Sequence, residues 1–134
     1  MTLAGIAEFF LGNTFPFVAY VVFGGHWFTQ GYASDPEHNI PAQYESGALN
    51  QAYNAGQGNY FVVLALTSFV FLLGSVRTNM PFVVVFFGLM MVFCFIAAGY
   101  YQLGFNPTEA GLEHTTYLFK IAGGFGFLAM MAGW

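Results

Sequence analysis

Four side chains within residues 12–33 combine aromatic surface with groups that can bind an anion and carry a proton: Phe23, His26, Trp27 and Gln30. On a helix, His26 and Gln30 share one face because they are four positions apart. Aromatic walls suit the methyl end of a small carboxylic acid, whereas imidazole and amide groups can donate hydrogen bonds to its oxygens. Imidazole also titrates near neutral pH and could carry a coupled proton. The alternative, a histidine bonded to a neighbouring helix backbone, is the more common situation for a buried polar side chain.

Two further ionisable groups, Glu8 and Lys120, lie in apolar segments. Glu8 could neutralise a cation, relay a proton or simply reach interfacial water. Lys120 is the only base in an apolar segment, and it could attract anions at the outer mouth of a pathway or extend to the membrane surface. Asn13 and Thr14 are placed to cap a helix that starts there, with Pro16 in its first turn.

Other chemistries find little support in the residue content. The chain has no histidine cluster with metal-ligand spacing and no nucleophile–base pair, so we expect neither an enzyme, nor a metal site, nor a cofactor. Cys94 is the single cysteine. Only two residues are lysine or arginine and the formal net charge is −4, which excludes a basic surface for nucleic acid.

The elements that would hold these side chains are membrane helices. Hydrophobic residues make up 57% of the chain and charged residues only 6%, against roughly 25% charged in ordinary soluble domains. We therefore predict an all-α polytopic transmembrane bundle that forms a single domain over residues 1–134 and is embedded in a lipid bilayer. Its spans are about four full helices and the end of another, approximately 1–11 (partial), 14–33, 60–76, 82–103 and 117–134, with a long external polar loop over 34–59 and a short loop over 104–116.

The few charges indicate how the chain is oriented. Arg77 is the only base in a loop, so the positive-inside rule puts that turn in the cytoplasm and both acidic loops outside. Residues 2–11 cross only about half of a bilayer, and the chain ends on its last membrane turn. For these two reasons we expect the chain to be a truncated piece of a longer protein.

Several motifs occur in order along the chain: L-A-G-I-A-E-F (3–9), G-N-T-F (12–15), F-G-G-H-W-F-T (23–29), S-V-R-T-N (75–79), F-F-G-L (86–89) and K-I-A-G-G-F-G-F-L-A (120–129). Together they resemble the acetate uptake transporter family, the YaaH or SatP-type proteins of bacteria and their fungal relatives. The extended S-V-R-T-N turn and the long acidic loop resemble the filamentous-fungal branch most.

The resemblance implies six transmembrane helices with both termini in the cytoplasm, of which this chain would supply helices two to six. It implies transport of acetate or other small monocarboxylates, usually with protons, in the plasma membrane. It also implies a narrow constriction to which Phe23 and Leu89 would contribute, and assembly as a homo-oligomer, a hexamer in bacterial members. His26 departs from the family, which usually has Phe there, and the first helix with its Asn-Pro motif is missing.

Two classes of function follow from these observations. The favoured one is proton-coupled passage of a small monocarboxylate through each protomer. The alternatives are a non-transporting truncated family member or membrane scaffold, or a protein linked to ammonium export, as some fungal relatives are.

Overall fold

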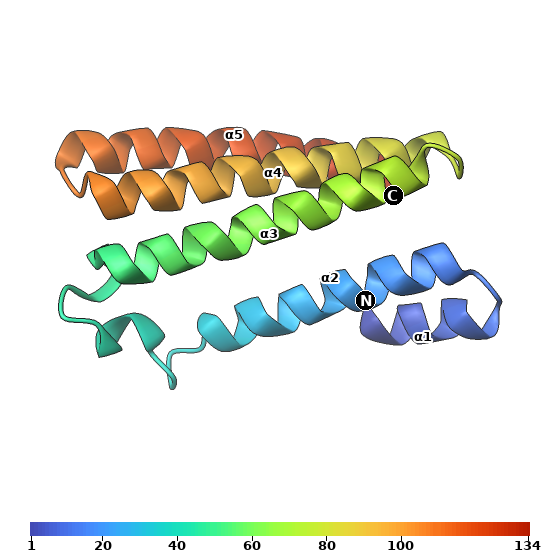
Figure 1. The fold of residues 1–134 in the computed structure, drawn as a ribbon, viewed down its shortest axis with the longest axis horizontal. Helices are drawn as coiled ribbons and strands as arrows, with labels where there is room; N and C mark the ends of the chain where they lie inside the picture. The colour runs from blue at the N-terminus through green and yellow to red at the C-terminus, as the bar shows by residue number, and fades with distance from the viewer. The chain divides into compact units, whose positions relative to one another are not determined.

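The computed structural model describes residues 1–134, and all of its regular elements are helical (Figure 1). The long elements are α1 (Thr2–Phe10), α2 (Thr14–Ala33), α3 (Gln51–Ser75), α4 (Met80–Phe105) and α5 (Glu109–Gly133), with short 3₁₀ helices η1 (Ile40–Gln43) and η2 (Gly47–Leu49). The predicted all-α class is confirmed. Contacts divide the chain into two compact units, Met1–Gln43 and Tyr44–Trp134, and each is described by itself.

The first unit is built on an antiparallel pair of helices, α1 and α2. Gly12 makes the connection at a φ of 79°, a left-handed conformation that glycine adopts without steric cost. Small residues bring the two backbones together: a Cβ added to Gly5 would lie 3.0 Å from the Val21 side chain and 3.2 Å from the Phe17 carbonyl oxygen. Gly24 packs against Thr2 at the other end of the pair. The short α1 therefore covers one face of α2.

The second unit is a three-helix bundle in which α4 packs against both α3 and α5 (Figure 1). Aromatic rings fill the contact with α3, where Phe61 stacks on Tyr100 and Phe93 at centroid distances of 5.5 and 6.0 Å. Flat or offset aromatic pairs of this kind stabilise packing by about 0.5–1.5 kcal/mol beyond the area that they bury.

The contact between α4 and α5 depends instead on small residues. A Cβ at Gly88 would meet the Ala129 side chain at 2.9 Å, so these helices touch almost backbone to backbone. Near the start of α5, the Thr115 hydroxyl is shared between two acceptors. It lies 3.3 Å from the Gly99 carbonyl oxygen of α4 and 2.9 Å from the Gly111 carbonyl oxygen of its own helix. Close approach through small residues is the usual way in which helices associate in lipid.

Helix α3 begins at Gln51 rather than at Tyr60, so the predicted loop over 34–59 is wrong in its last part and also contains the two 3₁₀ turns. The start is fixed by Asn50, whose side chain accepts hydrogen bonds from the backbone N–H groups of Ala52 and Tyr53. Asn54 is fully buried, and its amide donates to the carbonyl oxygens of Ala48 and Asn50. The cap at Asn50 and the hydrogen bonds of the buried Asn54 side chain thus stabilise the first turns of α3, although the sequence there is polar.

Helix α5 likewise begins at Glu109, well before the predicted Tyr117, because Thr108 caps it by accepting from the Gly111 N–H at 3.2 Å. The predicted loop over 104–116 is therefore wrong at both ends, because α4 continues to Phe105 and only residues 106–108 lie outside the two helices. It also follows that Lys120 lies near the middle of the last helix and not in its first turn.

Three helices, α3, α4 and α5, are long and apolar enough to cross a membrane by length and composition. At 1.5 Å per residue each is about 37–39 Å long, which exceeds the roughly 30 Å of a bilayer core. Helix α2 is not among the three, because Gly24, Gly25, His26 and Gln30 make it less apolar. Its crossing of the membrane stays a prediction.

Candidate functional site

Three of the predicted pathway residues form one row along α2. Phe23, His26 and Gln30 follow the helical period and lie on the side opposite the face that packs on α1. Phe23 and His26 are 4% and 6% exposed, and Gln30 is half-buried. The row therefore places an aromatic ring, an imidazole and an amide in succession along about one and a half to two turns of helix.

Trp27 does not belong to this row. Its side chain is 60% exposed, and the indole lies beside the imidazole of His26 with ring centroids 5.1 Å apart. It lines a groove of about 970 Å³ in the first unit, between the start of α1 and the second half of α2. The other lining residues are Met1, Thr2, Leu3, Gly24, Phe28, Gly31, Tyr32, Ser34, Asp35 and Pro36. The predicted set is thus divided between a buried row and an open aromatic groove.

Glu8 and Asn13 interact directly at the turn between α1 and α2. The Asn13 amide donates to Glu8 Oε2 at 2.6 Å. Asn13 stands at the N-cap position of α2, but its side chain makes no capping hydrogen bond, and Thr14 is already the first helical residue. The N-cap position is therefore Asn13, as predicted, but the side-chain capping bond is absent, and the Asn13 amide nitrogen binds the Glu8 carboxylate. This bond joins the ends of the two helices and gives Glu8 a partner.

Leu89 lies on α4 in the second unit. Gly88 and Val92 face α5, and Phe86 and Phe93 face α3. Leu89 falls between these two rows on the helical period and is half-buried. Its side chain therefore lies along the line where α3 and α5 flank α4. The structure describes Phe23 and Leu89 in separate units.

One polar contact was not predicted from the sequence. The Tyr101 hydroxyl donates to Asn59 Oδ1 at 2.6 Å, and the Tyr101 ring packs on Gly58. Tyr101 also lines an apolar groove of about 420 Å³ between α3 and α4, together with Val62, Ala65, Leu66, Phe69, Met90, Cys94, Ala97 and Ala98. An antiparallel pairing of 60–76 with 82–103 would have put these residues near one another. The contact was missed because residue 59 was assigned to a loop.

Comparisons with known protein families and with curated proteins both match nearly the whole length of the chain. The model of the GPR1/FUN34/yaaH family matches residues 1–134. Two relatives, each named Protein alcS and from two strains of Aspergillus fumigatus, are 29% identical over 140 residues. The alignment covers 99% of this chain and 50% of each relative, so the chain spans about half the length of these curated relatives. No solved structure matches.

Proposed function

The chain belongs to the GPR1/FUN34/yaaH family, and from this premise we propose that it moves acetate or a similar small monocarboxylate across a membrane together with a proton. The observation that carries the proposal is the family match over the whole of residues 1–134, since the family is acetate transporter-like. Three apolar helices of spanning length agree with an integral membrane protein. Location in the plasma membrane and assembly as a homo-oligomer belong to the same proposal.

The buried row on α2 supports a small carboxylate as cargo. A carboxylate needs hydrogen-bond donors once it leaves water, because an unpaired charge in an apolar medium is very costly. His26 and Gln30 can supply such donors, and the Phe23 ring next to them offers an apolar surface for a methyl group. A protonated imidazole would also neutralise the anion, which makes passage of acid and proton together the less costly route.

The size limit of the pathway is proposed to lie at Phe23 and Leu89, following the family resemblance. Both are bulky and apolar, and neither presents a group that could bind an anion tightly. Such a constriction would select by width, so acetate would pass more easily than longer or branched acids. Because the chain covers half of its curated relatives, this activity is proposed for the whole protein of which residues 1–134 are part.

The test is uptake of labelled acetate by cells whose own acetate uptake has been disabled and which express the full-length gene product. We expect uptake well above that of cells without the protein. Leu89→Trp should abolish it by filling the constriction. Val63→Trp is the matched control, because Val63 is 60% exposed on α3 and lies outside the proposed constriction.

Membrane amounts of all three proteins must be equal for the comparison to count. Background uptake by a correctly inserted wild-type protein would refute transport and favour the scaffold alternative. Equal uptake by wild type and Leu89→Trp would refute the constriction at Leu89.

A further inference from the structure

Lys120 occupies an unusual position for a charged side chain in a membrane helix. On α5 it lies about 16 Å from Glu109 and about 20 Å from Gly133, at 1.5 Å per residue. A bilayer core extends only about 15 Å from its middle to either edge. The backbone of Lys120 therefore lies at membrane depth wherever α5 is placed symmetrically across the bilayer.

The neighbouring helix gives an independent measure of this depth. Gly126 of α5 packs on Val92 of α4, and Phe119 packs on Gly99. Lys120 is therefore level with Ala98, about 8 Å from the middle of α4, the most apolar of the three candidate spans. Its α-carbon thus lies inside the hydrocarbon layer, in the half nearer the end of α4.

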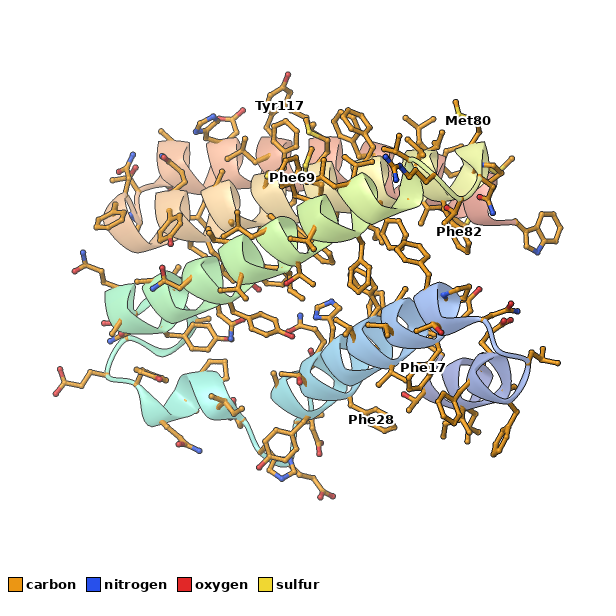
Figure 2. The ribbon with its side chains drawn as sticks, turned by 45° about the vertical axis from the view of Figure 1, so that its right-hand side comes forward. Phe17, Phe28, Phe69, Met80, Phe82 and Tyr117 are labelled. Atoms are coloured by element: carbon orange, nitrogen blue, oxygen red, sulfur yellow. The ribbon has the colours of Figure 1, made fainter.

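Lys120 is exposed and stands in the middle of the face that α5 turns away from α4. The contacts with α4 use the opposite face, through Thr115 and Ala129. Figure 2 shows Tyr117, one turn before Lys120 on the outer face, projecting away from the bundle. We call this outer face, formed by Thr116, Tyr117, Lys120, Gly123, Gly124 and Phe127, the α5 outer face.

The α5 outer face differs from the lipid-type surface of the same unit. The exposed side of α3 carries large apolar side chains, Val62, Val63, Leu66, Val70 and Leu73. The α5 outer face also exposes Tyr117 and Phe127, but a lysine, a threonine hydroxyl and two glycines lie between them, and α5 is the least apolar of the three candidate spans. A Cβ at Gly123 or Gly124 would meet nothing within 4 Å, so the outer surface beside the lysine is open and no side chain covers it.

No anion of the chain compensates the Lys120 charge. The one ion pair of the structure joins Asp35 and His38 in the other unit. Glu113 lies on α5 two helical turns before Lys120, and the two side chains form no ion pair. Ionisable groups at membrane depth are costly unless they are paired or lie along a substrate path.

We propose that Lys120 binds the carboxylate of a small monocarboxylate within the membrane, while the space beside Gly123 and Gly124 takes its short alkyl group. The inference rests on the proposed function for the identity of the cargo. An ammonium group is a compact cation with three donors, so it can bind a carboxylate without a fixed geometry. The two glycines leave room beside it that a larger side chain would occupy.

Lys120 is the only lysine within residues 1–134, so acylation of the peptide that contains it reports on this site. The full-length protein is placed in phosphatidylcholine nanodiscs and treated with an amine-acylating reagent, and the modified peptide around Lys120 is quantified by mass spectrometry. A carboxylate bound at Lys120 shields its amine from the reagent. We expect acetate to slow the acylation of Lys120 several-fold in a saturable manner. Chloride at the same ionic strength should leave the rate unchanged.

Two results would overturn the proposal. One is an acylation rate that acetate does not change. The other is protection that needs anionic lipid in the nanodisc and is indifferent to acetate, because the lysine would then serve a lipid headgroup.

Variants separate the parts of the site. Gly124→Leu should abolish protection by acetate, because the added side chain fills the space beside Lys120, whereas Val63→Leu on α3 should preserve it. Protection by acetate that survives Gly124→Leu would contradict the role of that space. In uptake, Lys120→Gln should raise the KM for acetate by about tenfold, the loss expected for one charge-assisted hydrogen bond, and Lys120→Arg should restore most of it.

Acylation needs no transport, so the two proposals can fail separately. Protection without uptake would refute the transport function and leave the binding site standing. Uptake without protection would refute the binding site alone.

Discussion

The close contact between α4 and α5 at Gly88 allows a quantitative prediction about the stability of the protein. At Gly88 an added Cβ would lie 2.9 Å from the Ala129 side chain and 3.1 Å from the Phe125 carbonyl oxygen. Non-bonded carbons prefer about 3.5–4.0 Å, so Gly88→Ala must separate the helices by at least about half an ångström. Neither neighbouring atom is the end of a flexible side chain. We therefore expect the free energy of unfolding to fall by about 1–3 kcal/mol, the usual cost of overpacking.

Gly124→Ala is the matched control, because the same methyl group meets nothing within 4 Å there. Both substitutions gain the same helix propensity, up to about 1 kcal/mol, so their difference isolates the steric term. Equilibrium unfolding of the purified protein in mixed micelles, followed by circular dichroism, measures that difference. Equal stability of the two variants would show that α4 and α5 are not in the close contact described. The unfolding assay requires no transport activity.

Three further predictions concern the pathway and the topology. Leu89→Ala should admit larger acids such as lactate, because it widens the proposed constriction, and unchanged selectivity in an assembled variant would count against it. His26→Phe should leave folding and acetate uptake intact but shift the pH dependence of uptake, because the substitution removes the titratable imidazole from the row; superimposable pH profiles would remove the proton-carrying role. In a Cys94→Ala background, an impermeant thiol reagent added outside should label Ser46→Cys but not Asn79→Cys. The opposite pattern would reverse the orientation deduced from Arg77.

The sequence predicted the helical elements more reliably than their ends. Helix α2 has the predicted bounds, because the aromatic and β-branched run over 14–33 stops where polar residues and Ser34 begin. The starts of α3 and α5 were missed because they lie in polar sequence. There the helix depends on capping by Asn50 and Thr108 and on packing against α4, which hydropathy does not report.

Phe23, His26, Trp27 and Gln30 were predicted together as pathway residues of α2. Three of them lie in one row along the helix, and Trp27 does not. Helical spacing correctly put His26 and Gln30 on one face, since that follows from the period alone. It did not separate Trp27 from the buried row, because exposure depends on where α1 packs. The position of Lys120 within α5 could not be obtained either, since it depends on where the helix begins. The bond between Asn13 and Glu8 was not predicted either, because residue type alone indicated only that Asn13 could cap the helix.

The most direct test of small-monocarboxylate transport is counterflow in liposomes that contain the full-length protein. Neutral acetic acid crosses bilayers unaided, so the measurement is made at pH 7.5, where carboxylic acids are almost fully ionised. Vesicles preloaded with unlabelled acetate should take up external labelled acetate faster than empty vesicles and faster than protein-free vesicles. Preloading with an acid too wide for Phe23 and Leu89 should give no such acceleration. Labelled acetate that enters all these vesicles at one rate would contradict transport by this protein.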